Sequence, residues 1–217
     1  MSYINERRQE ERARRREEII DAAESIYAEL GWDAVTMDKV ARTARLSRAL
    51  LYVYFQDKGD LHLAIVERAL VTLRLRMEAA IVAGQPGLDQ LEAIGRAYLA
   101  FAQESPHLFD ACARFQTHHG DEDVTHPSTL DCTSAGHRVH ETVVATLREG
   151  IEDGSIRNDL VDLNATAINA WAFSHGVIQI LASKGGQIAK AGTTSDAVTE
   201  QAFSLIRRAL QPARQPS

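Results

Sequence analysis

The sequence lacks long apolar runs, disulfide-forming cysteine clusters and an excess of positive charge. No stretch approaches the ~18 uninterrupted apolar residues of a membrane span, and no apolar run follows the charged N-terminus, so we expect a cytoplasmic protein that contacts no membrane. The two cysteines, Cys112 and Cys132, are too few for a disulfide framework, and we expect two free thiols. Because the net charge is −6, binding to a polyanion would require a local concentration of positive charge.

Motifs of catalysis and metal binding are also missing. There is no phosphate-binding glycine loop, no Gly-x-Ser-x-Gly and no strand-like alternation, so we expect neither an enzyme nor a cofactor. No Cys-x-x-Cys or His-Glu-x-x-His spacing is present, and we assign no metal site. His137 and His140 would share a helix face near His118, His119 and His126, so a metal-responsive protein is one alternative. A helical ligand-binding protein or enzyme is another.

Helix-type apolar periodicity fills most of the chain. A stripe that begins at Ile19 ends at Gly31, and a second stripe, over 58–83, stops at the Gly and Pro residues of 84–87. Further helices are predicted at about 88–101, 108–115, 129–152, 163–184 and 195–210, with Ser195 or Asp196 as the last cap and with loops at 117–128 and 185–194. We therefore predict an all-α protein with an N-terminal three-helix domain (1–57) and a C-terminal helical bundle (58–217).

Two helix-start signals with a short connection lie within residues 36–55, TMDKVARTARLSRALLYVYF. Thr36 and Ser47 can each cap a helix, because the hydroxyl accepts a hydrogen bond from an otherwise unpaired backbone N–H. Leu51 and Phe55 would bury one side of the second helix. The opposite side would be exposed, and it carries Arg48, Ala49, Tyr52 and Val53, with Tyr54 at the flank.

This pattern is typical of a helix-turn-helix, whose second helix enters the DNA major groove. Arg48 lies in the first turn of that helix, where a guanidinium can pair with guanine O6 and N7, and Ala49 and Val53 suit a thymine methyl. Donors that could reach backbone phosphates are carried by Thr36, Tyr52, Tyr54 and Lys58. Positive charge gathers here, since 39–58 holds Lys39, Arg42, Arg45, Arg48 and Lys58 against Asp57 alone.

The same stretch resembles the DNA-binding segment of the TetR (tetracycline-repressor-like) family of bacterial transcriptional regulators. The resemblance is carried by Ala44, Ser47, the Leu-Tyr-Val-Tyr-Phe run of 51–55 and Lys58. Two residues depart from the family pattern. Arg45 stands where Gly is usual, so either it adopts a positive φ or the turn has another shape, and Leu50 stands where a small or hydroxylated residue is common. The candidate DNA contacts are Thr36, Arg45, Ser47, Arg48, Ala49, Tyr52, Val53, Tyr54 and Lys58.

The resemblance implies a homodimeric repressor that a small-molecule effector releases from its operator. The last two helices, about 163–210, would form the dimer contact, and the helix over 58–83 would either act as a lever between the domains or merely join them. His175, one turn after Trp171 on an apolar helix, needs a hydrogen-bond partner. It is either a satisfied core or interface histidine or a polar group in an effector cavity. The candidate cavity residues are Tyr98, Phe101, Phe109, Phe115, Trp171 and His175.

The first residues, 1 to about 13, are polar or charged and show no apolar face, so we expect them to fray. Two accounts of their arginines are open. They could form an arm that lies along DNA, or they could belong to a solvated helical extension with Glu–Arg pairs at spacing three or four, which we favour.

Overall fold

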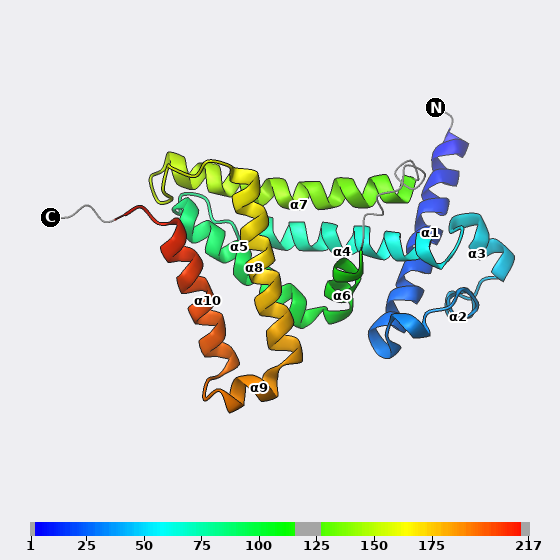
Figure 1. Cartoon of the computed structure of the whole chain (residues 1–217). Helices are drawn as coiled ribbons and strands as arrows, with labels where there is room; N and C mark the ends of the chain where they lie inside the picture. Colours follow the sequence, from blue (N-terminus) through cyan, green and yellow to red (C-terminus); the bar gives the residue numbers. More distant parts are fainter. Residues whose placement is uncertain (1–2, 116–126, 214–217) are drawn as a thin grey trace. The chain divides into compact units, whose positions relative to one another are not determined.

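The computed structural model describes residues 3–115 and 127–213, and all regular structure in these ranges is helical (Figure 1). The elements are α1 (Tyr3–Leu30), the 3₁₀ turn η1 (Trp32–Ala34), α2 (Met37–Thr43), α3 (Arg48–Tyr54), α4 (Lys58–Ala80), α5 (Gly87–Glu104), α6 (Pro106–Arg114), α7 (Pro127–Glu152), α8 (Leu163–Ser183), α9 (Gly185–Lys190) and α10 (Ser195–Leu210). The all-α prediction is confirmed. The loop predicted at 117–128 lies mostly outside the described residues, as do His118, His119 and His126.

The described residues pack into two compact units. Unit 1 contains those of Met1–Leu70 and Ser105–Ala135, and unit 2 contains those of Val71–Glu104 and Gly136–Ser217. Helices α4 and α7 each contribute to both units. Packing therefore does not divide the chain at residue 57, because α6 joins unit 1, and the functional division at that residue stays a prediction.

Unit 1 is built on the apolar face of α1. Ile19 and Ala23 of α1 are fully buried, together with Val40 of α2 and Leu51 of α3. Gly31 follows α1 with a φ of +80°, a conformation that suits glycine and ends the helix where the sequence predicted.

Polar contacts fasten the other helices of unit 1 to α1. Arg68 of α4 reaches three carboxylates of α1, at Glu17 (2.6 Å), Asp21 (2.6 Å) and Glu24 (3.0 Å). The Tyr27 hydroxyl donates to Asp110 of α6 at 2.7 Å, which holds α6 on the same helix.

The first turns of α1 are helical, since the helix already includes residues 3–13, and the fraying expected there stays a prediction. Glu–Arg pairs support these turns without an apolar face, at Glu11–Arg14 (2.7 Å) and Arg15–Glu18 (2.7 Å), both at spacing three. The structure thus shows a solvated helical extension.

Unit 2 has its own apolar core, in which residues from α5, α7, α8 and α10 meet. A Cβ at Gly87 would lie 2.3 Å from the backbone nitrogen of Gly150, so the start of α5 approaches α7 as closely as only glycine permits. The buried members of this core are Leu88, Leu91, Val144, Leu147, Ile156, Ala167 and Leu210.

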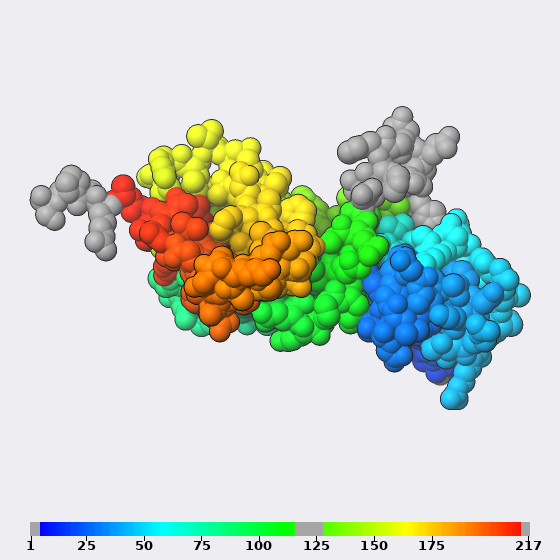
Figure 2. Space-filling model, turned by 60° about the horizontal axis from the view of Figure 1, so that its bottom comes forward, coloured from blue at the N-terminus to red at the C-terminus, as the bar shows by residue number. Residues whose placement is uncertain are grey.

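Helices α8 and α10 of unit 2 are joined through the short α9, which Figure 2 shows in orange at the surface. The sequence predicted a loop there, because the segment begins with two glycines; the structure instead forms a short helix over Gly185–Lys190. The cap of α10 is Thr194, whose hydroxyl accepts from the backbone N–H of Ala197 at 3.1 Å, and not the predicted Ser195 or Asp196.

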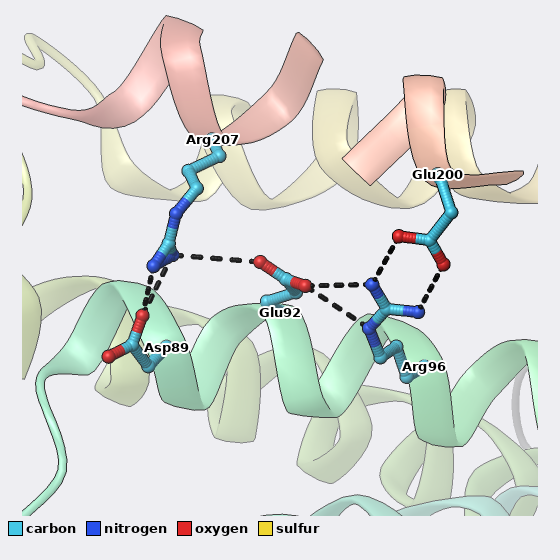
Figure 3. A network of polar contacts seen from close by, with 5 residues as sticks. All are labelled: Asp89, Glu92, Arg96, Glu200 and Arg207. Atoms are coloured by element: carbon cyan, nitrogen blue, oxygen red, sulfur yellow. Dashed lines mark hydrogen bonds and ion pairs between the residues drawn. The ribbon is translucent and has the colours of Figure 1, made fainter. Parts of the chain in front are cut away.

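A chain of ion pairs connects α5 to α10 (Figure 3). Arg96 of α5 pairs with Glu92 (2.9 Å) and with Glu200 of α10 (2.8 Å), and Arg207 of α10 pairs with Asp89. Exposed ion pairs stabilise a fold little one by one, so the main effect of the network is to fix the register of α10 on α5.

Two further findings concern membranes and thiols. None of the described helices combines the length and the apolar character that a bilayer crossing requires. Cys112 and Cys132 are free thiols, as predicted, and burial raises the pKa of each to about 12, so both are neutral near pH 7.

Candidate nucleic-acid interface and ligand site

Both predicted caps are present in the α2–turn–α3 segment. The Thr36 hydroxyl accepts from the backbone N–H of Lys39 at 3.2 Å, and the Ser47 hydroxyl accepts from that of Leu50 at 3.2 Å. Each cap satisfies one N–H that the first turn of a helix leaves unpaired. The two short helices therefore begin at residues that local sequence determines.

The turn between α2 and α3 uses a left-handed residue. Arg45 has a φ of +55°, the only positive φ of a non-glycine residue in the described parts of the chain. The turn is closed by hydrogen bonds from the Leu46 N–H to the Ala41 carbonyl (2.8 Å) and from the Arg45 N–H to the Arg42 carbonyl (3.1 Å). Of the two alternatives for this position, the positive φ is the one observed, at a conformational cost of about 1 kcal/mol.

Helix α3 has one anchored face and one exposed face. Leu51 is fully buried and Phe55, at the end of the helix, is 1% exposed. On the other side Tyr52 is 42% and Val53 62% exposed, and Arg48 and Ala49 are also exposed. Four of the side chains that the sequence assigned to DNA, Arg48, Ala49, Tyr52 and Val53, thus lie on the exposed face of α3.

Arg48 is held in place from two sides. Its Nε lies 3.3 Å from Oδ1 of Asp38 on α2, and an Nη lies 3.5 Å from the Tyr52 hydroxyl. The Tyr52 hydroxyl and then the Asp38 carboxylate raise the pKa of Arg48 above its usual value, so the guanidinium is always charged. Sequence reasoning missed Asp38, because its contact with Arg48 depends on how α2 crosses α3.

Lys58 has a more local partner than a phosphate. Its Nζ donates to the Trp32 carbonyl at 2.9 Å and lies 4.6 Å from the centroid of the Trp32 ring. An ammonium has three N–H donors, so a phosphate could still use another of them. Tyr54 is half-buried and Thr36 is exposed with its hydroxyl serving as a cap, so their proposed phosphate contacts also stay predictions.

Three of the predicted ligand residues meet in unit 2. The Tyr98 hydroxyl lies 2.8 Å from Nδ1 of His175, and the Trp171 indole N–H points to the same hydroxyl at 3.4 Å. Burial lowers the pKa of His175, so its imidazole is neutral near pH 7. The sequence predicted that His175 needs a hydrogen-bond partner, and in the structure that partner is Tyr98. Phe101 is also buried in unit 2, whereas Phe109 and Phe115 belong to unit 1, and an effector role for all six residues stays a prediction.

A hollow of about 300 Å³, including space open to solvent, lies between α5, α8 and α10. Its lining is apolar and includes none of the six predicted ligand residues. A Cβ at Gly95 would come within 2.8 Å of the Phe203 ring, so glycine lets that ring pack at this wall. The lining residues are Gly95, Leu99, Phe173, Ser174, Val177, Ile178, Thr199, Ala202, Phe203 and Ile206.

The described histidines of α7 have protein partners. His137 Nε2 lies 3.1 Å from Glu141, and His140 Nε2 lies 3.1 Å from the amide oxygen of Asn164. In residues 3–115 and 127–213 no group of three or more His, Cys, Asp or Glu side chains is placed to hold a metal ion. The metal-responsive alternative therefore has no support in these ranges.

Two short capped helices, the second with a polar outward face, define a helix-turn-helix protein. Comparison with family models agrees and is more specific. Residues 19–65 match the model for bacterial regulatory proteins of the tetR family, and residues 91–213 match the tetracyclin repressor-like C-terminal domain. The chain belongs to the TetR family.

Relatives with known names match only part of their length. The transcriptional regulator BetI of Rhizobium meliloti (strain 1021) is 34% identical over 101 residues, which are 46% of this chain and 50% of BetI. The transcriptional regulator HbdR of Aromatoleum sp. (strain CIB) is 38% identical over 58 residues, which are 27% and 25% of the two chains. The match thus spans half or less of each of these curated relatives.

Solved structures share the fold over almost the whole chain. A protein of unknown function from Rhodococcus sp. RHA1 has a TM-score of 0.73 and 24% identity, with 91% of this chain and 95% of that chain covered. FadR of Bacillus subtilis, solved in complex with stearoyl-CoA, has a TM-score of 0.67 and 17% identity, with 87% and 96% covered. At these identities the likeness establishes the fold alone.

Proposed function

We propose that the protein is a transcriptional repressor that binds operator DNA as a homodimer in the cytoplasm and leaves it when a small molecule binds unit 2. The observation that carries the proposal is the exposed face of α3. Its inner face is anchored by Leu51 and Phe55, and its first turn presents Arg48, in the position where a recognition helix meets base edges.

The apolar surface of α8 and α10 supports the homodimer. Ile168 (50%), Trp171 (58%) and Ile180 (51%) of α8 are exposed in the single chain, as is Leu205 (48%) of α10. Ile168 and Trp171 are three positions apart and therefore share a face of α8, and an exposed apolar face of this kind commonly marks a protein–protein contact. A two-fold dimer would present two α3 helices to half-sites about 34 Å apart, one turn of DNA.

The Tyr98–His175–Trp171 group supports a neutral effector. These side chains of α5 and α8 offer hydrogen-bonding atoms without a net charge. Such a site favours an apolar molecule with a hydroxyl or carbonyl group. The stearoyl-CoA complex of the similarly folded FadR supports a ligand with a large apolar part. We propose that this molecule shifts α4, which has residues in both units, and so changes the spacing of the two α3 helices.

Selection of bound duplexes from a random DNA pool tests the proposal. We expect an enriched sequence with two-fold symmetry, whose half-site centres are separated by about one or two helical turns. Sedimentation of the complex should give two chains per duplex. A pool that stays random after repeated rounds would contradict DNA binding, and one chain on an asymmetric site would contradict the dimer.

Operator release then gives a way to test the effector site. Compounds that release the selected duplex should bind the Tyr98→Phe variant about tenfold more weakly, because one hydrogen bond to the ligand or to His175 is lost. Operator affinity without the compound should not change. Equal release of both proteins by every active compound would place the effector elsewhere.

A further inference from the structure

The N-terminal turns of α1 carry a stripe of arginines that the helix-turn-helix does not account for. Arg8, Arg12 and Arg16 follow one another at a spacing of four residues, so they lie on one face of the helix. These turns precede residue 19, where the family match begins. We call Arg8, Arg12 and Arg16 the arginine stripe.

Acidic residues lie on another face of the same turns. Glu6, Glu10 and Glu17 are spaced by four and seven residues and therefore share a face, which the helical period places opposite Arg8 and Arg12. Acidic and basic residues are nearly equal in number in this segment, but Arg8 and Arg12 lie on one side of the helix and Glu6, Glu10 and Glu17 lie on the other.

The stripe is unfavourable for the helix alone. Like charges at spacing four repel, and the residues three and four positions from Arg12 are Arg8, Gln9, Arg15 and Arg16, without an acidic side chain. Among the described residues neither Arg8 nor Arg12 forms an ion pair, and both are exposed, whereas Arg14 pairs with Glu11 at 2.7 Å. A polyanion would relieve the repulsion between Arg8 and Arg12, whereas Arg16 already pairs with Glu17 at 3.5 Å.

The stripe starts beside the recognition helix. The Arg16 guanidinium lies 5.6 Å from the centroid of the Phe55 ring, and Phe55 is the C-terminal cap of α3. From Arg16 to Arg8 the helix advances by about 12 Å, the rise of about three base pairs. The arginine stripe therefore starts at the buried C-terminal end of α3, and it is long enough to meet more than one phosphate.

We propose that Arg8 and Arg12 bind the phosphate backbone of the DNA that flanks each half-site, so that α1 is a second DNA-contacting element. This inference rests on the proposed function of α3 as the recognition helix. Arg16, which contacts Phe55 and pairs with Glu67 at 3.5 Å, orients the stripe. The contact is to phosphates, so it adds affinity and salt dependence but no base preference.

The test compares two double variants on two duplexes. Arg8→Ala/Arg12→Ala removes the stripe, and Arg7→Ala/Arg14→Ala removes the same charge from the same turns on another face. Operator affinity is measured against salt concentration, once on the selected site with about one helical turn of flanking DNA at each end and once on the site trimmed of its flanks.

For the stripe variant on the long duplex, we expect the slope of log K against log salt to fall by about two per protomer, from about 0.9 for each phosphate contact. On the trimmed duplex the slope of the stripe variant should match that of the wild type. On the long duplex the Arg7→Ala/Arg14→Ala control should lose at most half as much slope as the stripe variant loses. Arg8→Lys/Arg12→Lys should retain the slope. Alanine favours helix, so the helical circular dichroism of the stripe variant should be unchanged.

Equal slopes for the two double variants, or an equal loss on the trimmed duplex, would overturn the inference. Failure of the proposed function looks different, because then the wild type itself would enrich no duplex. If the wild type selects an operator while the stripe variant keeps its full salt slope, only the role of α1 is contradicted.

Discussion

Helices α3 and α8 are both left partly uncovered in the single chain, but the two exposed faces differ in chemistry. The exposed face of α3 carries a guanidinium and a phenol, at Arg48 and Tyr52, and its opposite side is firmly buried. Helix α8 buries only Ala167 and Ile178 among its described residues and exposes large apolar side chains such as Ile168. Exposure alone therefore does not identify a partner. The polar face suits a charged polymer and the apolar face suits another protein surface.

The largest effect should come from a charge placed on α8. Ile168→Asp should weaken the dimer at least about a hundredfold, because association would bury an unpaired carboxylate in an apolar contact. Sedimentation equilibrium measures this change, and operator binding should fall with it. Leu30→Asp places the same charge at an exposed apolar site of unit 1, where Leu30 is 60% exposed, and should leave the dimer intact. If the Ile168→Asp variant dimerised as tightly as the wild type, the assignment of this face of α8 to the dimer contact would be wrong.

The next effect concerns the reading face of α3. Arg48→Ala should reduce discrimination among bases at one position of each half-site by about tenfold to a hundredfold, since a bidentate contact to guanine would be lost. Binding of mutated duplexes in competition measures the change. Arg42→Ala removes an equal charge from α2 and should weaken all sequences alike. If the Arg48→Ala variant keeps the base preference of the wild type, Arg48 does not contact a base in a sequence-specific way.

A smaller effect tests the turn that sets α3. Arg45→Gly should raise the free energy of unfolding by about 1 kcal/mol relative to Arg45→Ala, because only glycine adopts the observed φ of +55° without a steric penalty. Both variants lose the same charge, so urea denaturation of the pair isolates the backbone term. Equal stabilities would mean that the turn carries no strain.

The smallest effect should come from the residue that holds Arg48. Asp38→Asn keeps the shape of the side chain but removes the negative charge that competes with DNA for the guanidinium. Binding to random-sequence DNA should rise by about two- to fivefold, while binding to the operator rises less, so specificity falls. If the affinities for random-sequence DNA and for the operator rose by the same factor, Asp38 would influence the overall affinity for DNA but not the specificity.

Local signals made much of unit 1 predictable from the sequence. The caps at Thr36 and Ser47 and the helix end at Gly31 depend on atoms within a few residues of one another, and all three were predicted. The helical extension at the start of α1 was the account that the sequence favoured, because Glu–Arg pairs at spacing three, and not an apolar face, support it. The short α9 was missed because glycines at its start suggested a loop.

Contacts between distant residues could not be read in this way. Asp38 reaches Arg48 across a helix crossing, Lys58 finds the carbonyl of Trp32, and Tyr98 meets a histidine 77 positions later. The sequence identified a histidine that needed a partner without identifying the partner. Only tertiary packing decides which polar groups meet, and therefore which residues of a surface are free to bind.

The position of Lys58 gives the protein a built-in optical probe. Its ammonium lies over the indole of Trp32, so a phosphate that attracts this charge would change the electric field at the ring. The fluorescence of Trp32 should then shift when DNA binds, without an attached dye. A Trp171→Phe background leaves Trp32 as the single emitter, and the arrival of DNA could be followed in real time.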